Sequence, residues 1–308
     1  MEDRICIFNP EHDICLANGN GNFVPPRSAL AFARGGASLM RLVYGEGSKA
    51  CSVEDFDLSM LETGGRIVAW GWDLVVRRQL LKKGVPERFL PTEEYIDTLR
   101  HLQHRSSILC LQPESDALVS VGELERKLSY MGKIVMKAPW SGSGRGIRWV
   151  TGELSRQDVC WFEKVVRDQR CVIVEPRREV ADDFALEYYC EGENLRFVGY
   201  SLFKTQSGVY RHNVLMDDEG IGHLLKSRMV DGSEGLSAFR SRVEMWLKTH
   251  VVGRYEGPLG VDFYVDNAGE VFLGEVNFRH TMGLVAHELL RCRPGLEGRL
   301  FNPFSFEM

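Results

Sequence analysis

Two strongly apolar segments late in this 308-residue chain each contain an acidic residue, and this placement restricts how the segments can fold. Asp262 interrupts GVDFYV, and Glu275 interrupts EVFLGEVNF. The linking sequence DNAG has Asp first and Gly last, as a type I turn prefers, so the two segments predict a hairpin. Strand interiors rarely bury charge without a partner, so we expect the two carboxylates to share a face with a cation.

The expected register places both acids on the same face of this hairpin. If DNAG is a four-residue turn, Asp262 lies opposite Leu273, and Glu275 is its diagonal neighbour. Asn277 points the same way as Glu275, because side chains two apart on a strand share a face. Two carboxylates and an amide oxygen suit Mg²⁺, so Asp262, Glu275 and Asn277 are the predicted metal ligands. A slip of one residue would send Asp262 to the other face, and an exposed hairpin with solvated acids is the alternative.

Arg279 follows Asn277 by two residues and would continue on the same face of the strand. Its planar guanidinium can hold a phosphate or a carboxylate through two parallel hydrogen bonds. Arg279 is therefore a candidate for binding a substrate anion beside the metal ligands.

The sequence KAPWSGSGRGI at 137–147 has a lysine and glycines in an order opposite to that of a P-loop. A P-loop places its glycines before its lysine, at the start of a helix. Here Lys137 ends the apolar run IVM, and the glycines follow it. Glycine lets the backbone approach phosphate closely, so the loop indicates a phosphate site between two strands. A plain flexible hairpin tip is the alternative.

Composition excludes several classes of function. The net charge of −5 gives no basic field for nucleic acid. No apolar run is long enough for a membrane helix, and the start MEDRICIFNP lacks the regions of a signal peptide. The eight cysteines form no CxxC pair, which predicts reduced thiols and a cytoplasmic location.

Strand and helix patterns divide the chain into three sections, 1–92, 93–180 and 181–308. The first has expected strands at 4–8 and 66–70 and helices at 27–43 and 73–83, the alternation of an open parallel sheet. The second has expected helices at 93–105 and 156–168, a capping box of Ser120 and Glu123, and strands at 133–137, 147–150 and 171–175. The third has expected strands at 183–190, 195–203, 208–216, 260–265 and 270–278 and a helix at 233–251.

Together these motifs resemble the ATP-grasp superfamily, in particular its carboxylate–amine ligases, with distant similarity to D-alanine–D-alanine ligase and biotin carboxylase. The resemblance covers about residues 93–290. It implies an α/β protein, α+β in its catalytic part, with an N-terminal open parallel domain and two α+β subdomains that enclose ATP. In this family a strand lysine reaches the nucleotide phosphates, and a glycine-rich flap closes over them. The corresponding residues here are Lys137, Ser141, Gly142, Ser143, Gly144, Arg145 and Gly146.

The resemblance also implies further nucleotide contacts. The segment CVIVEP is similar to the family strand that meets adenine, which assigns this contact to Val174 and Glu175. Pro176 has no N–H, so a carbonyl or a later residue must serve there. On the following strand, Asp183 or Glu187 would contact the ribose or, through a metal, the phosphates. Arg105, with Arg100 as the alternative, stands where the family usually has a second lysine.

The implied chemistry is carboxylate activation with ATP and about two Mg²⁺ ions bound by the predicted metal ligands. Lys137 and Arg279 are the implied catalytic residues. ATP would phosphorylate a small-molecule carboxylate, and an amine would displace phosphate from the acyl phosphate. The turn TMG at 281–283 is similar to a substrate-binding turn of the D-alanine–D-alanine ligase type. The alternatives are a kinase that acts on a hydroxyl group and a nucleotide-binding module without catalysis. A homodimer is possible by analogy.

Two polar segments are the candidates for substrate specificity. One is the turn-rich loop 9–27, which follows the first strand and contains Glu11, His12, Asp13 and Arg27. The other is the segment 204–213, with Lys204, Tyr210, Arg211, His212 and Asn213. A polar hairpin loop is the alternative for the second segment. His280 is expected beside the site, and His287 is expected to be an ordinary helix residue.

Overall fold

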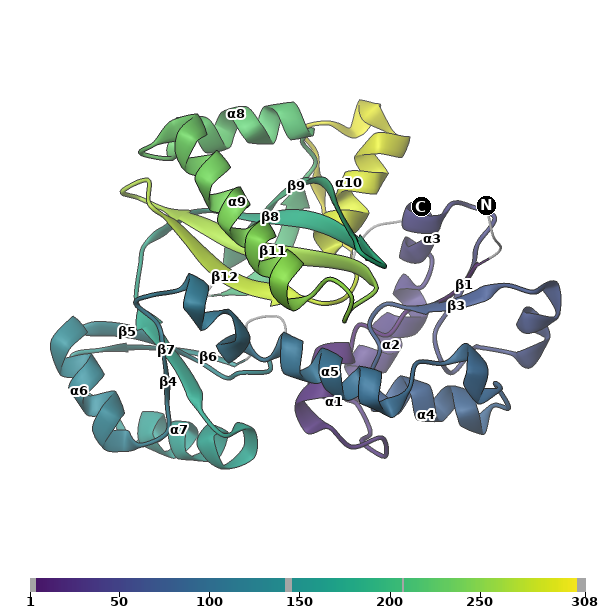
Figure 1. Cartoon of the computed structure of the whole chain (residues 1–308), viewed down its shortest axis with the longest axis horizontal. Helices are drawn as coiled ribbons and strands as arrows, with labels where there is room; N and C mark the ends of the chain where they lie inside the picture. The colour runs from purple at the N-terminus through teal and green to yellow at the C-terminus, as the bar shows by residue number, and fades with distance from the viewer. Residues whose placement is uncertain (1–3, 142–145, 207, 304–308) are drawn as a thin grey trace.

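The structure is a computed structural model of the chain and describes residues 4–141, 146–206 and 208–303. Figure 1 shows three lobes, with the N-terminal lobe at the right, the central lobe at the lower left and the C-terminal lobe above both. Each lobe is built on its own sheet within the described residues.

The N-terminal lobe contains a parallel sheet of order β2-β1-β3, which confirms the predicted open α/β arrangement. Its two predicted apolar runs form β1 and β3, and residues of both strands pack against α4 in one core. The elements of this lobe are β1 (Arg4–Ile7), α1 (His12–Asn18), α2 (Arg27–Gly36), α3 (Leu39–Tyr44), β2 (Lys49–Cys51), η1 (Leu58–Thr63), β3 (Arg66–Ala69), α4 (Leu74–Lys82) and η2 (Glu87–Phe89).

Two expectations for this lobe were wrong. The segment 27–43 forms two helices, α2 and α3, because the poor helix formers Gly35 and Gly36 end the first of them. The loop 9–27 contains the short helix α1, which ends where Gly19 adopts a left-handed φ of 68° and donates its N–H to the Cys15 carbonyl.

The central lobe is an antiparallel sheet of order β4-β7-β5-β6, with α6 and α7 packed against it in one core. The predicted capping box of Ser120 and Glu123 is present at the start of α6. The elements that follow the N-terminal lobe in the sequence are α5 (Glu93–Gln103), η3 (Arg105–Leu111), β4 (Asp116–Leu118), α6 (Val121–Met131), β5 (Lys133–Lys137), β6 (Ile147–Thr151), α7 (Arg156–Gln169) and β7 (Val172–Pro176).

The C-terminal lobe is an antiparallel sheet of order β12-β11-β8-β9-β10-β13. Helices α8 and α9 bury apolar side chains against one face, and α10 packs on the other. Its elements are β8 (Val180–Glu191), β9 (Asn194–Gln206), β10 (Val209–Val214), α8 (Asp218–Arg228), α9 (Gly232–His250), β11 (Gly257–Asp266), β12 (Val271–Asn277), α10 (Met282–Cys292), η4 (Pro294–Leu296) and β13 (Leu300–Phe301).

The N-terminal and C-terminal lobes share a core. Phe8 and Trp70 of the first lobe belong to the same apolar cluster as Val285 and Leu289 of α10. The α10 helix is therefore held between the sheet of its own lobe and the parallel sheet.

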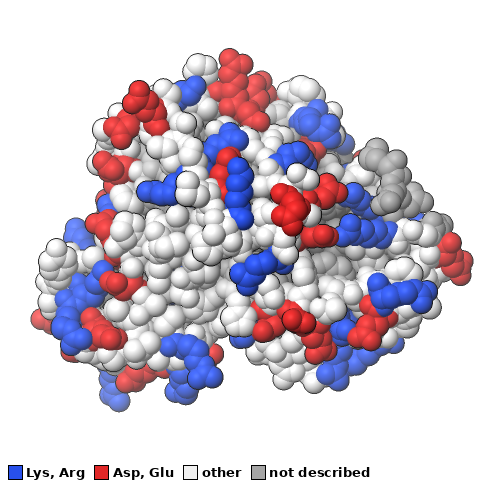
Figure 2. All heavy atoms as spheres, in the orientation of Figure 1, with Lys and Arg blue, Asp and Glu red and all other residues white. Residues whose placement is uncertain are grey.

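One face of the molecule carries charges of both signs. On the face shown in Figure 2, acidic and basic side chains are interspersed over all three lobes. Every helix in the described part of the chain is too short or too polar to cross a bilayer.

His287 on α10 provides a pH-dependent contact with α8. Its Nε2 lies 3.5 Å from Asp218 Oδ2, and its Nδ1 lies 3.8 Å from Glu288 Oε1. The hydrogen bond to Asp218 and the nearby carboxylate of Glu288 raise the pKa of His287 to about 9. The folded-state pKa is thus above the unfolded value, so this stabilisation is complete below about pH 6.5 and is lost as the pH rises through 9.

We therefore expect His287→Gln to lower the free energy of unfolding on the order of 1–3 kcal/mol at pH 6 and to have little effect by about pH 10. Urea denaturation of both proteins across this range measures the difference. His223→Gln is the control, because the His223 side chain is 73% exposed. A His287 effect that does not change with pH would contradict the charged contact.

Candidate active site

The β11–β12 hairpin places Asp262 directly opposite Glu275 rather than diagonal to it. The connecting loop is one residue shorter than predicted, so Phe263 pairs with Leu273. This slip alone would send Asp262 to the other face. A β-bulge at Gly274 restores the shared face, and an added Cβ there would lie 3.1 Å from the Asp262 carbonyl oxygen. The predicted register was wrong, whereas the predicted shared face is confirmed.

The two acids form a place where a cation would relieve electrostatic repulsion. Burial raises the pKa of Asp262 well above its usual range, and the carboxylates of Glu275 and Glu187 raise it further. Asn277 donates from Nδ2 to Asp262 Oδ2 at 2.9 Å and accepts from Arg279 Nη2 at 3.0 Å. Its amide would have to turn over for the oxygen to join the carboxylates. No group of three or more His, Cys, Asp and Glu in the described residues is placed to hold a metal.

Arg105 connects this pair of acids to the base of the glycine-rich loop. Its buried guanidinium forms an ion pair with Glu275. It also donates to the Ala138 carbonyl at 2.6 Å, to Ser141 Oγ at 2.7 Å and to the Ser141 carbonyl at 3.1 Å. The Gly146 carbonyl closes the hairpin by accepting from the Ala138 N–H. The expected phosphate-binding residues Gly142, Ser143, Gly144 and Arg145 lie outside the described residues.

Lys137 and Glu175 come together from neighbouring strands β5 and β7. The Lys137 Nζ lies 2.5 Å from Glu175 Oε1, and the two side chains are 12% and 6% exposed. The predicted phosphate lysine is thus held beside the predicted adenine-binding strand. The side chain of Val174 is buried in the core of the central lobe, so only its backbone is available for a ligand.

Arg279 binds Asp13 through two hydrogen bonds. Its Nε donates to Asp13 Oδ1 at 2.9 Å, and its Nη2 donates to Asp13 Oδ2 at 2.8 Å. Burial opposes ionisation of Asp13, but the charge and hydrogen bonds of Arg279 outweigh burial and lower the pKa of Asp13. The two hydrogen bonds that the sequence predicts between Arg279 and a substrate anion are therefore made to a side chain of the N-terminal lobe.

Glu187 and Asp183 have different surroundings on β8. Glu187 is buried, accepts from Thr281 Oγ1 at 2.8 Å and from Ser201 Oγ at 3.1 Å, and burial raises its pKa to about 7. Thr281 also caps α10 by accepting from the Leu284 N–H, so Glu187 fixes the start of that helix. Asp183 accepts from Thr205 at 2.8 Å.

A cavity of about 210 Å³ lies over this face of the sheet and is lined by the hairpin acids and Arg279. Three predicted nucleotide-binding residues, Lys137, Glu175 and Arg105, do not line it. Its charged lining consists of Asp13, Glu187, Asp262, Glu275 and Arg279. The rest of the lining is Pro10, Phe32, Trp70, Ala185, Ser201, Phe203, Thr205, Gly208, Tyr210, Asn213, Asn277, Thr281, Met282, Gly283 and Pro303.

Comparison with known proteins supports the fold. No family model and no curated protein matches the sequence. Among solved structures, N5-carboxyaminoimidazole synthetase from Staphylococcus aureus with ADP has a TM-score of 0.52 at 11% identity, over 94% of this chain and 77% of that one. The biotin carboxylase domain of Hydrogenobacter thermophilus 2-oxoglutarate carboxylase, with MgADP and bicarbonate, has a TM-score of 0.56 at 14% identity, over 94% and 69%. D-alanyl-alanine synthetase A from Vibrio cholerae has a TM-score of 0.51 at 14% identity, over 94% and 93%. This chain has the ATP-grasp fold.

Several sequence candidates lie away from the cavity. Lys204 forms an ion pair with Asp182 on the opposite face of the sheet, because Asp182 pairs with the core residue Val265. Arg211 and Arg27 are exposed and do not line it. Glu11 and His12 are buried within the N-terminal lobe. Of the segment 204–213, Tyr210 and Asn213 line the cavity and hydrogen-bond to each other at 2.7 Å.

Among the aromatic residues of the cavity, sequence reasoning named Tyr210 but missed Phe32, Trp70 and Phe203. Trp70 directly follows β3, and the carboxyl end of a parallel strand is where open α/β sheets bind ligands, so this signal was available. Phe32 sits on a helix that carries no comparable motif. His280 is buried beside Trp70, as expected for a residue next to the site, and burial lowers its pKa to about 4.

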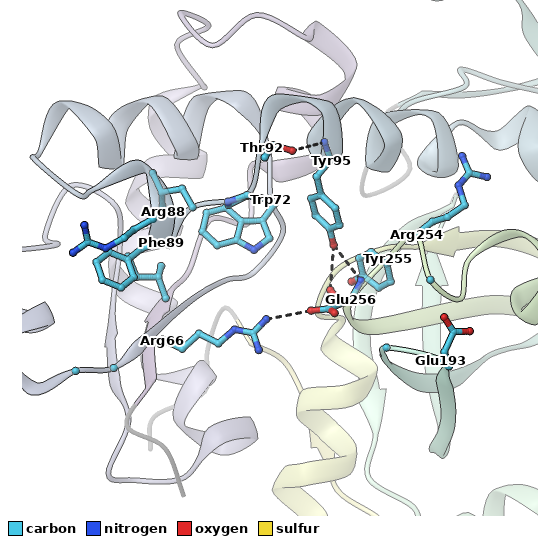
Figure 3. A pocket seen from close by; sticks show the side chains of 17 residues that line it. Arg66, Trp72, Arg88, Phe89, Thr92, Tyr95, Glu193, Arg254, Tyr255 and Glu256 are labelled. Atoms are coloured by element: carbon cyan, nitrogen blue, oxygen red, sulfur yellow. Dashed lines mark hydrogen bonds and ion pairs between the residues drawn. The ribbon is translucent and has the colours of Figure 1, made fainter.

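A larger cleft, of about 1240 Å³, lies between the N-terminal and C-terminal lobes. Figure 3 shows Trp72, Phe89 and Tyr95 on one side, with Arg66 paired to Glu256 across the opening. None of the residues assigned above to the candidate active site lines this cleft. This cleft is therefore separate from the candidate active site.

Gly283 offers a test of how α10 is seated on Glu187. An added Cβ would overlap Glu187 and Ser201. We expect Gly283→Ala to lower the free energy of unfolding by about 1–3 kcal/mol in chemical denaturation, as overpacking usually does. In the control Gly222→Ala on α8, the added methyl group meets nothing within 4 Å, so the change should be neutral or mildly stabilising. Equal effects of the two changes would refute this packing.

The Asp13–Arg279 pair offers a test of contact between the lobes. Removing one partner of a buried ion pair leaves the other unpaired, so we expect Asp13→Ala to destabilise the protein by about 3 kcal/mol in urea denaturation. Glu256→Ala is the control. It breaks the Arg66–Glu256 pair, whose side chains are 67% and 59% exposed, and should cost less than about 1 kcal/mol. A cost for Asp13→Ala as small as that of the control would mean that the pair does not join the lobes in solution.

Proposed function

We propose that this protein is an ATP- and Mg²⁺-dependent ligase that joins a small-molecule carboxylate to an amine or amino acid and releases ADP and phosphate. The observation that carries the proposal is the opposed pair Asp262–Glu275 in an ATP-grasp fold. Arg105 contacts this pair directly, and Arg279 is connected to it through Asn277.

The proposed reaction has two steps. An oxygen of the substrate carboxylate attacks the γ-phosphorus of ATP, and the bond from that phosphorus to the ADP oxygen breaks. The amine nitrogen then attacks the acyl carbon, phosphate leaves, and the nitrogen loses a proton. Phosphoryl transfer requires mainly positioning and neutralisation of charge, so it needs no nucleophilic side chain from the protein.

Two basic residues of the central part of the chain and the charged residues of the cavity would supply both requirements. Lys137 and Arg105 would neutralise the nucleotide phosphates from the central lobe side. Arg279 would bind the substrate carboxylate or the transferred phosphoryl group. Asp262 and Glu275, with Asn277 after its amide turns, would hold Mg²⁺, which when bound supplies positive charge between phosphate oxygens. The S. aureus structure with ADP and the H. thermophilus structure with MgADP support this choice of nucleotide and metal, and the family resemblance favours two ions.

The β5–β6 flap has a chemical purpose in this proposal. Water hydrolyses acyl phosphates, so the intermediate must be shielded until the amine attacks. Arg105 holds the base of the flap at Ser141 and also contacts Glu275. Closure of the flap would thus be linked to the charge at the metal-binding acids.

ATP turnover tests the proposal directly. Purified protein is given ATP, Mg²⁺ and pools of carboxylic acids, with hydroxylamine as a general amine that traps acyl phosphates as hydroxamates. We expect ADP, free phosphate and hydroxamate in equal amounts, dependent on one acid. ADP with a phosphorylated hydroxyl compound and no free phosphate would establish the kinase instead.

Two substitutions test the assigned residues. Lys137→Ala and Glu275→Gln should each lower kcat/KM by about 100-fold or more, because each removes charge that stabilises the transferred phosphoryl group or its metal. The matched controls are Lys164→Ala, whose side chain is 64% exposed, and Glu193→Gln in the separate cleft. Activity of either test variant close to that of its control would remove that residue from the mechanism.

A further inference from the structure

The cavity has an apolar wall that the proposed chemistry does not use. Phe32 of α2, Trp70 after β3 and Met282 of α10 line it. All three belong to, or pack against, the apolar cluster shared by the two lobes. Trp70 is only 3% exposed, whereas Phe32 and Met282 are partly buried. The wall is therefore a part of the protein core that is open to the cavity.

Ring contacts fix this wall relative to the anion-binding arginine. Phe32 packs edge-on against Phe8 at 5.4 Å, and Phe8 packs edge-on against Trp70 at 5.0 Å. Trp70 stacks on His280 at 5.6 Å. The His280 carbonyl accepts a hydrogen bond from Arg279 Nη1 at 3.0 Å. An anion on Arg279 would thus lie at one end of a continuous row of rings.

On the sheet face beneath the cavity, the residues next to Asp262 have small side chains. Asp262 pairs with Ala185, and Ala185 pairs with Ser201, so these three share one row of the sheet. Ala185 and Ser201 both line the cavity. Phe203 and Tyr210, with ring centroids 6.3 Å apart, stand beyond them.

The acids of the cavity already have hydrogen-bond or ion-pair partners. Asp13 is bound by Arg279, and Glu275 is bound by Arg105. Asp262 accepts from an amide. The aromatic wall accordingly presents carbon surface, where an apolar group is favoured and an added charge would be desolvated without a partner.

The volume restricts the size of such a group. The cavity measures about 210 Å³. An engineered protein cavity of about 150 Å³ binds benzene. The space thus limits such a group to about the size of a benzene ring.

We propose that the carboxylate substrate bears a compact apolar group, branched or aromatic, and that Phe32, Trp70 and Met282 bind it. This inference rests on the proposed ligase function for its statement that the acid is the phosphorylated substrate. The apolar wall then sets specificity, while Arg279 holds the carboxylate end.

A series of acids tests the specificity. Acetate, 3-methylbutanoate, phenylacetate and the charged acid succinate are compared as substrates with hydroxylamine and ATP. A hydrophobic pocket discriminates by about 10-fold or more per missing methylene, so kcat/KM should rise by at least 100-fold from acetate to phenylacetate. Succinate should stay near acetate. Rates within 3-fold across the series, or a preference for succinate, would overturn the proposal.

Two variants assign the effect to the wall. Phe32→Ala and Met282→Ala should each raise the KM for phenylacetate by about 10-fold or more and leave the KM for acetate within about 3-fold. The matched control is Phe89→Ala, since Phe89 lies in the separate cleft of Figure 3 and is 44% exposed. Equal changes for both acids would show a structural effect and count against the proposal. Using two variants keeps the test informative if one fails to fold.

Calorimetric binding without turnover separates the two proposals. Phenylacetate should bind the unsubstituted protein more tightly than acetate, and Phe32→Ala should remove this preference. If no acid supports ATP turnover but the preference holds, the ligase is refuted and the apolar pocket stands. If acids turn over without regard to their apolar group, the ligase stands and the pocket is refuted.

Discussion

The repulsion between Asp262 and Glu275 is the constraint on which the rest of the site depends. Two carboxylates on directly paired residues destabilise each other, and burial strengthens the effect. The neighbouring groups reduce this cost. Arg105 binds one acid and Asn277 donates to the other. The same groups then connect the acids to the flap at Ser141 and to Arg279, so the charge of one hairpin organises residues from all three lobes.

Local patterns predicted most of the long elements of this protein but missed α8 and the short strands β2, β4 and β13. Apolar runs marked the strands, and an N-terminal serine with a glutamate three residues later marked a helix start. The hairpin acids were also recognisable, because charge inside an apolar strand needs a partner. The exact pairing was not, because neither the shorter loop nor the bulge at Gly274 follows from the local pattern. The predicted loop was one residue too long, and the bulge was not predicted. These two errors cancelled, so the face expected for Asp262 was still correct.

Contacts between distant parts of the chain were beyond reach of the sequence. The partner of Arg279 is Asp13, 266 positions away, and no periodicity links the two. Lys204 was a reasonable polar candidate, but the pairing of β8 with β9 and β11 turned it to the other face. The aromatic wall combines a helix, a strand end and a second helix, and only the docking of two lobes makes it one surface.

The contact between Asp13 and Arg279 also makes Asp13 a tethered competitor. An incoming anion must displace or share this internal carboxylate, which is present at the high effective concentration of a group on the same folded chain. Weakly binding anions in the surrounding solution are thereby kept from the arginine. A substrate that gains further free energy elsewhere in the cavity has an advantage that its carboxylate alone would not provide. An anion therefore displaces Asp13 from Arg279 only when the rest of the same ligand also binds in the cavity.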